Sequence, residues 1–259
     1  MAIGRAIGAF IKLGRPKFLV GGFVFYGMGA ALAVAAGAPF DLSLYAWGQL
    51  VVTAAQLMTH YANDFFDLEA DRANRTPTRW SGGSRVLPDG ALPPGVALAA
   101  ALVLGFGAMG ATVALAVRAP DRPLLVPVGV VMTTLAWAYS APPLRLAARG
   151  LGELTTAAVV TLSVPLLGYY LQAGDVHPRI FAACLLPCLL QFAMLLAIEL
   201  PDAAGDAVAG KRTLVVRLGA VTGARLMSMS CRFRRRAISP VIQLLAALGA
   251  APARTASSK

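Results

Sequence analysis

Two groups of carboxylates stand out because each lies at the end of a long apolar stretch. In NDFFDLEAD, the side chains of Asp64, Asp67 and Asp71 are spaced i, i+3 and i+7, so on a helix they share one face. In DAAGD, Asp202 and Asp206 are spaced i, i+4 and also share a face. Like charges at these spacings repel, so a cation is expected between them. Mg2+ typically combines one or two carboxylates with phosphate oxygens and water, so the two groups predict a site that bridges Mg2+ to a diphosphate.

Basic residues follow both acidic groups. Arg72 and Arg75 come after the first group, and Lys211 and Arg212 come after the second. Arginine and lysine side chains both bind phosphate oxygens well. A single group would fit a solvated helix end of mixed charge equally well. Two such groups, each followed by basic residues, favour the diphosphate site.

The segments that must position these groups are apolar and uncharged. Apolar residues make up 58% of the chain and charged residues only 14%. Six segments contain no Asp, Glu, Lys or Arg: residues 18–40, 42–63, 90–117, 123–144, 154–174 and 180–198. About 20 apolar residues span a bilayer as a helix, and a backbone inside lipid must satisfy its own polar groups. We therefore expect an all-α integral membrane protein, a polytopic bundle of six transmembrane helices.

The net charge of +11 is distributed unevenly between the loops. With the N-terminus in the cytoplasm, the inner segments hold 14 basic residues, whereas the outer loops hold only Arg118, Arg122 and Arg179. This bias is the positive-inside rule. It predicts a cytoplasmic N-terminus and a multi-pass protein of the inner (plasma) membrane whose partner is the lipid bilayer, not nucleic acid.

The arrangement of motifs resembles the UbiA-type membrane prenyltransferase superfamily. NDFFDLEAD fits the family pattern NDxxDxxxD, and DAAGD fits its second pattern, DxxxD. Three further stretches are similar to family segments in the same order: LGRPKF (13–18), YSAPPLRLAARGLGEL (139–154) and GKRTLVVRLG (210–219). The resemblance covers about residues 13–225. It implies transfer of an isoprenyl group from a prenyl diphosphate donor to an aromatic acceptor, with Mg2+ as cofactor.

Matching positions carry the roles that this resemblance implies. The metal ligands would be Asp64, Asp67, Asp71, Asp202 and Asp206, and the catalytic residues would be Asp64, Asp67, Asp202 and Tyr139. The residues that bind substrate would be Asn63, Arg15, Arg75, Lys211 and Arg145. Independently of the family, metal ions and basic groups are suited to stabilise charge on a leaving diphosphate.

Three candidates have simpler alternatives. Tyr139 could equally be an aromatic residue of the membrane interface. His60 lies one turn before Asp64, where it either supports the site or packs at the helix end, and we interpret it as packed. Glu199 lies near the membrane end of its segment, where an acid is costly unless it faces a cavity, so we include it as a site candidate.

The stretches SGGSRVLPDGAL (81–92) and PPLRLAARGLGEL (142–154) resemble the branch that prenylates 1,4-dihydroxy-2-naphthoate in menaquinone biosynthesis. We therefore expect this acceptor. The alternatives are 4-hydroxybenzoate, as in ubiquinone biosynthesis, and homogentisate, haem, chlorophyllide or a glycerol phosphate lipid.

The family normally has nine transmembrane helices, whereas six are evident here. We interpret residues 1–225 as an incomplete UbiA-type domain and residues 226–259 as a basic, alanine-rich tail of the kind that a shifted reading frame produces. A helix is expected to begin near Ala220, but Arg225 and later arginines interrupt it. An inactive remnant that only binds Mg-prenyl diphosphate is thus an alternative to an active enzyme. A transporter is disfavoured, because the segments carry no ionisable residues near their centres.

Overall fold

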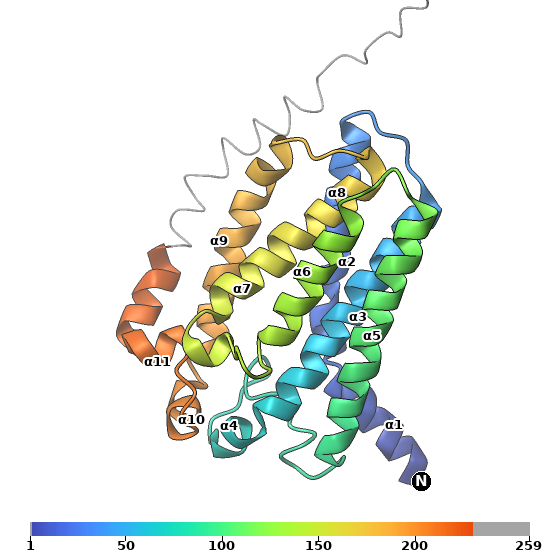
Figure 1. The fold of residues 1–259 in the computed structure, drawn as a ribbon. Coiled ribbons are helices and arrows are strands. Elements are labelled where there is room, and N and C mark those ends of the chain that lie inside the picture. The colour runs from blue at the N-terminus through green and yellow to red at the C-terminus, as the bar shows by residue number, and fades with distance from the viewer. Residues whose placement is uncertain (1, 230–259) are drawn as a thin grey trace, which may run out of the picture.

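The computed structural model describes residues 2–229, which form only helices and connecting loops (Figure 1). The helices are α1 (Ala2–Leu13), α2 (Pro16–Ala35), α3 (Leu42–Phe66), α4 (Leu68–Ala73), α5 (Pro94–Arg118), α6 (Leu125–Ala138), η1 (Ala147–Arg149), α7 (Gly152–Ala158), η2 (Val159–Ser163), α8 (Val164–Ala173), α9 (Arg179–Glu199), α10 (Ala203–Val208) and α11 (Leu214–Leu218). The π-helical turn η2 joins α7 and α8 into one continuous helix. The expected all-α membrane bundle is confirmed.

Each of the six predicted membrane segments coincides with a helix or, for 154–174, with the continuous α7–η2–α8 helix. Four of these, α2, α5, α7–η2–α8 and α9, are long and apolar enough to cross a membrane. The α6 helix is apolar but has only 14 residues, and the 25-residue α3 helix carries polar side chains such as Gln49 and Gln56. Large apolar side chains face outward, for example Phe106, which is 77% exposed. Such a surface suits lipid.

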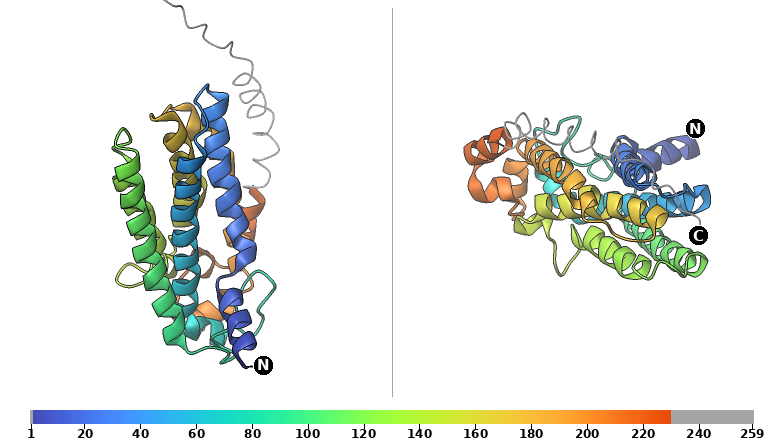
Figure 2. Two further views of the ribbon diagram at one scale, coloured as in Figure 1. Left: turned by 90° about the vertical axis from the view of Figure 1, so that its right-hand side faces the viewer. Right: turned by 90° about the horizontal axis from the view of Figure 1, so that it is seen from above.

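The bundle depends on close approach between helices at small residues. The α2 helix packs along α8, and an added Cβ at Gly29 would lie 1.9 Å from the backbone oxygen of Pro165. An added Cβ at Gly168 would likewise lie 2.3 Å from the backbone oxygen of Tyr26. Small residues at membrane helix interfaces allow this approach of backbones. The α3 helix lies at the centre of the bundle, between α2 and α5 (Figure 2).

The short helices gather at one end of the bundle. In Figure 1, α4 and α10 lie at the same end as α1, and α4 packs against α10. The two acidic motifs are therefore brought to one end of the bundle by segments far apart in the sequence. A helical segment begins at residue 220, as expected, and continues to residue 229 despite Arg225. The rest of the predicted tail lies outside the described residues, and its proposed boundary stays a prediction.

Candidate active site between two acidic motifs

The first acidic motif crosses a bend at the end of α3. Asp64 lies in the last turn of α3, Asp67 lies between α3 and α4, and Asp71 lies in α4. Helical hydrogen bonds continue across the bend, because the amides of Asp67 and Asp71 donate to the oxygens of Asn63 and Asp67, each over 2.9 Å. All three carboxyl side chains are buried. The predicted common face therefore persists although the helix is divided.

The second motif begins just after α9. Asp202 precedes α10 and Asp206 lies within it, with the Asp206 amide donating to the Asp202 backbone oxygen over 2.9 Å. The Asp206 side chain is buried, and Asp202 is half-buried. Because α10 packs against α4, the two motifs face each other.

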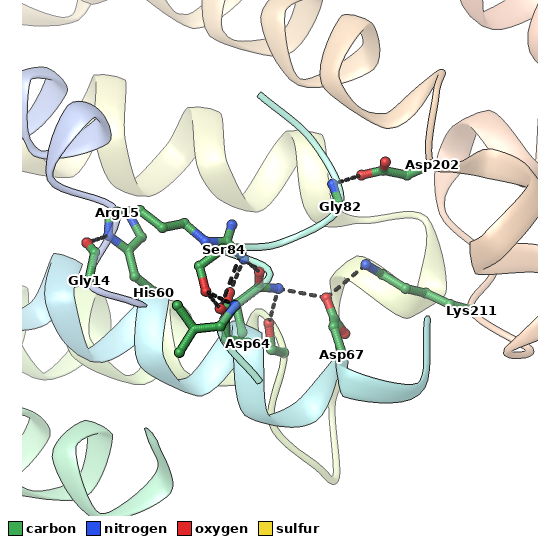
Figure 3. Close-up of polar contacts among 12 residues, drawn as sticks. Gly14, Arg15, His60, Asp64, Asp67, Gly82, Ser84, Asp202 and Lys211 are labelled. Atoms are coloured by element: carbon green, nitrogen blue, oxygen red, sulfur yellow. Dashed lines mark hydrogen bonds and ion pairs between the residues drawn. The ribbon is translucent and has the colours of Figure 1, made fainter. Parts of the chain in front are cut away.

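Lys211 links the two motifs directly. Its Nζ donates to Oδ2 of Asp67 over 2.8 Å (Figure 3). The same Nζ lies 3.6 Å from Oδ1 of Asp206. A second link runs from Asn74, after α4, whose Nδ2 donates to Oδ1 of Asp202 over 2.7 Å. The sequence predicted Lys211 as a partner of phosphate, and the structure places it at the junction of both motifs.

Arg15 is the cation nearest Asp64. Its guanidinium forms an ion pair with the Asp64 carboxylate and donates to Oδ1 of Asn63 over 3.0 Å. Asn63 in turn donates through Nδ2 to Asp67, over 2.6 Å, and to Oγ of Ser140, over 3.0 Å. Arg15 lies in the turn between α1 and α2, with a positive φ of 48° just before Pro16. These contacts tie the start of α2 to the first motif.

The loop of residues 81–84 contacts both motifs, which the sequence did not predict. The Gly82 amide donates to Oδ2 of Asp202 over 2.9 Å, whereas Ser84 donates to Oδ2 of Asp64 through its amide, over 3.2 Å, and through its hydroxyl (Figure 3). Gly83 packs so tightly that an added Cβ would lie 2.0 Å from Oδ2 of Asp71. The signal was the Gly-Gly pair, since both glycines adopt positive φ.

Two carboxyl groups of the site, those of Asp71 and Asp206, have pKa values that burial raises. Burial raises the pKa of Asp71 to about 7, an effect that the nearby Arg15 charge only partly offsets. Burial also raises the pKa of Asp206 to about 6, against the opposing effect of Lys211. For Lys211, burial lowers the pKa, but the charges of Asp67 and Asp206 outweigh it and the pKa is raised. The site thus holds a permanent ammonium together with two carboxyls, Asp71 and Asp206, whose pKa values burial raises toward neutral pH.

The side chains of this site are better suited to Mg2+ that also binds a phosphate than to a metal ion coordinated by protein side chains alone. Across residues 2–229, no three acidic, His or Cys side chains converge as a ready set of metal ligands. The Asp64, Asp67 and Asp202 carboxylates instead face nitrogen donors, while Oδ2 of Asp71 is buried without a hydrogen-bond partner. Mg2+ usually takes only one or two carboxylates and completes its shell with phosphate oxygens and water. The arrangement therefore suits a metal that arrives with its substrate.

Of the remaining residues predicted to belong to the site, one lies near the acidic motifs and two do not. Tyr139, after α6, is half-buried and interacts electrostatically with Glu199, Lys211 and Asp67. Arg75 and Arg145 are exposed, and their side chains form no ion pair or hydrogen bond within residues 2–229. The structure therefore does not bring these two arginines into the cluster.

His60 and Glu199 are both fixed by the surrounding packing. The His60 ring lies 2.7 Å, at Nδ1, from the backbone oxygen of Gly14, so it fastens the turn that carries Arg15 (Figure 3). Glu199 is buried at the end of α9, and α7, which carries the buried Glu153, packs against α9. The sequence analysis did not single out Glu153. Its signal was a single acid beside the uncharged run of residues 154–174.

Residues 23–253 match the model of the UbiA prenyltransferase family. The chain belongs to this family. No curated protein sequence matches the chain significantly.

Several solved structures share the fold of this chain. A UbiA homologue from Archaeoglobus fulgidus bound to GPP and Mg2+ is 15% identical, with a TM-score of 0.69, over 91% of this chain and 78% of that chain. The same homologue bound to DMAPP and Mg2+ is 15% identical with a TM-score of 0.66, over 95% and 79% of the two chains. A digeranylgeranylglyceryl phosphate synthase is 18% identical with a TM-score of 0.63, over 93% and 78%. At these identities the likeness establishes the fold alone.

Proposed function

We propose that this UbiA-family protein transfers an isoprenyl group from a prenyl diphosphate to an aromatic acceptor at the membrane. The observation that carries the proposal is the Lys211 contact to Asp67 and Asp206, which joins the two acidic motifs into one site. A site of alternating carboxylates and cations is suited to a metal diphosphate. The related Archaeoglobus fulgidus structures contain GPP or DMAPP with Mg2+, which supports the same class of donor here.

Mg2+ would be held by Asp64, Asp67 and Asp71 on one side and Asp202 and Asp206 on the other, and it would neutralise charge developing on the leaving diphosphate. Arg15 and Lys211 supply fixed positive charge at the same place, because each is already held against a carboxylate of the first motif. Asn63 orients Asp67 through its 2.6 Å hydrogen bond. Preorganised charge of this kind lowers the barrier to breaking the allylic C–O bond.

The apolar bundle would protect the resulting allylic cation from water until a ring carbon of the acceptor attacks it. Tyr139 lies within electrostatic reach of Lys211 and Asp67, where the negative face of its ring could stabilise positive charge. We assign Arg75 and Arg145 a weaker role, as exposed cations that attract anionic substrates toward the site.

The acceptor that we propose is 1,4-dihydroxy-2-naphthoate, which would place the reaction in menaquinone biosynthesis. The support is the sequence of residues 81–92 and 142–154. The 81–84 part of this sequence also contacts Asp64 and Asp202, so acceptor choice and the metal site would share a loop. 4-Hydroxybenzoate is the main alternative. The distribution of basic residues supports an inner (plasma) membrane location with a cytoplasmic N-terminus.

A transfer assay tests the proposal. Membranes containing the protein would receive labelled geranyl diphosphate, Mg2+ and, separately, 1,4-dihydroxy-2-naphthoate, 4-hydroxybenzoate or homogentisate. Prenylated naphthoate as the main product would support the proposal, and product from another acceptor would reassign the substrate. Donor binding without any product would instead support the inactive remnant.

A further inference from the structure

The 12-residue helix α1 is exposed over most of its length. Every residue from Ile3 to Gly8 is exposed, whereas Leu13, the last residue of the helix, is buried. An added Cβ at Gly4 or Gly8 would meet no atom within 4 Å. A helix of this length is only marginally stable in water without packing, and two glycines weaken it further. Within residues 2–229 the bundle leaves the first two turns uncovered, so another surface must stabilise them.

The α1 helix has an apolar face and a basic face. The apolar face consists of Ile3, Ile7 and Ile11, which follow one another at a spacing of four and are 76%, 56% and 57% exposed. The basic face consists of Arg5 and Lys12, which are also exposed and lie on the opposite side of the helix. A helix of this kind lies along a bilayer surface, with its apolar face toward the acyl chains and its cations toward anionic headgroups.

The residues that follow α1 place it at the level of the lipid headgroups. The exposed Val20, Phe23 and Val24 of α2 begin the surface that faces the acyl chains. Before them, Lys17 lies over the ring of Trp80, with its Nζ 4.7 Å from the centroid, and Trp80 is 50% exposed. Tryptophan and lysine together are typical of the membrane–water interface. The α1 helix therefore leaves the bundle at the interface, at the end that carries both acidic motifs (Figure 1).

The last turn of α1 is fastened to the candidate active site through α3. The Tyr61 hydroxyl donates to the backbone oxygen of Phe10 over 3.0 Å, and the two rings lie 5.0 Å apart. Arg15, two residues beyond the helix, forms the ion pair with Asp64. A change in the position of α1 would therefore reach the cation that contacts the first acidic motif.

We propose that α1 docks on the bilayer surface through its apolar face, that its basic face binds the headgroups of anionic phospholipids, and that this docking holds Arg15 in place. The charge of the helix determines the partner, because α1 carries two cations and no acidic residue. Cations beside a membrane surface are attracted by anionic lipids. The docking is independent of the proposed function, whereas its effect on donor binding rests on that function.

Hydrogen exchange of the α1 amides in the full-length protein tests the docking. The protein would be placed in nanodiscs of phosphatidylglycerol, which is anionic, or of phosphatidylcholine, which has no net charge. We expect exchange to be at least about tenfold slower in phosphatidylglycerol, because two cations at an anionic surface correspond to a factor of about thirty.

Two variants separate the contributions of the two faces. R5E should remove most of the difference between the lipids. A glutamate in the first turn suits the helix dipole, so this variant does not weaken the helix itself. I7Q/I11Q should exchange faster than the wild type in both lipids, although glutamine forms helices at least as well as isoleucine. R179E is the matched control, since Arg179 is an exposed arginine in the first turn of α9, whose other end leads into the second motif.

The outcomes distinguish the parts of the proposal. Equal exchange in the two lipids would overturn the anionic partner, and fast exchange in both would overturn docking on the bilayer. An equal effect of R5E and R179E would overturn the role of the basic face.

Donor affinity is the second measurement. Binding of geranyl S-thiolodiphosphate with Mg2+ should be several-fold tighter in phosphatidylglycerol, and R5E should remove this gain. Faster α1 exchange in R5E with unchanged donor affinity would overturn the link to Arg15. A wild type whose α1 exchanges slowly but which binds no donor in either lipid would contradict the proposed function and leave the docking intact.

Discussion

Lys211 gives the sharpest prediction, because one side chain holds both acidic motifs. In a K211M variant, Asp67 and Asp206 lose the ammonium that lies 2.8 Å and 3.6 Å from their carboxylate oxygens. The three side chains are only 15%, 7% and 6% exposed, so the pair is a buried one. Removing one partner of a buried ion pair costs about 3–5 kcal/mol. Asp67 keeps its hydrogen bond from Asn63, so we expect the lower end, about 3 kcal/mol.

The destabilisation should depend on pH in a defined direction. Burial already raises the pKa of Asp206 from its ordinary 3.8 to about 6, and loss of Lys211 raises it further. The fold favours the protonated carboxyl, so the stranded group keeps its proton at low pH and carries no charge. The penalty is absent below the ordinary pKa of 3.8, grows as the pH rises through the raised pKa, and is complete above it. We expect K211M to lose more stability at pH 8 than at pH 5.

The assay is thermal unfolding of detergent-solubilised protein, without Mg2+, at pH 5 and pH 8. A loss of 3 kcal/mol corresponds to a fall in Tm of about 6–12 °C for a chain of this size. K12M is the matched control, since Lys12 is an exposed lysine of α1. A fall in Tm no larger than that of K12M would refute the bridging role. An equal fall at both pH values would refute the electrostatic explanation.

Three further predictions test the loop, the helix packing and the titration of the site. G83A should lose Mg2+-dependent binding of geranyl diphosphate by more than tenfold, because its Cβ would meet the carboxylate of Asp71, whereas G90A, at an equally positive φ but in open space, should not. G29A should lower the Tm by several degrees by separating α2 from α8, and G21A, which faces open space, should leave it unchanged. Binding of Mg2+ with the donor should weaken as the pH falls from 8 to 6, since Asp71, with a pKa near 7, must lose its proton to bind a cation. Isothermal titration across this range measures the effect, and an affinity independent of pH would contradict it.

The fold was predictable to the extent that local sequence dictates it. Uncharged runs of membrane-spanning length predicted where six of the helical segments lie, and the i, i+3, i+7 spacing predicted the common face of Asp64, Asp67 and Asp71. The division between α3 and α4 at Asp67 was not predictable, because neither proline nor glycine marks it. A run without charged residues is not a reliable measure of helix length or of apolar character. The α6 helix is shorter than its uncharged run, and the α3 helix carries polar side chains.

The sequence indicated that the two acidic motifs and their neighbouring cations belong together, but it did not indicate the contacts between them. Lys211 was expected near a phosphate, yet its pairing with Asp67 joins residues 144 positions apart and depends on how α10 packs against α4. Arg75 was expected in the site because it follows Asp71 closely, but it lies in the loop after α4 and faces solvent. Glu153 was overlooked because a single acid has no local pattern. Its burial follows from the packing of α7 against α9.

The most direct test of the central claim is a double-mutant cycle on donor binding. Mg2+-dependent binding of geranyl diphosphate would be measured for D64N, D202N and the double variant, with E69Q as control. If the two motifs form one site, each single variant should reduce binding strongly, and the double variant should be little worse than either. Full additivity of the two losses, or normal binding in either single variant, would show that the motifs act separately and would contradict the account.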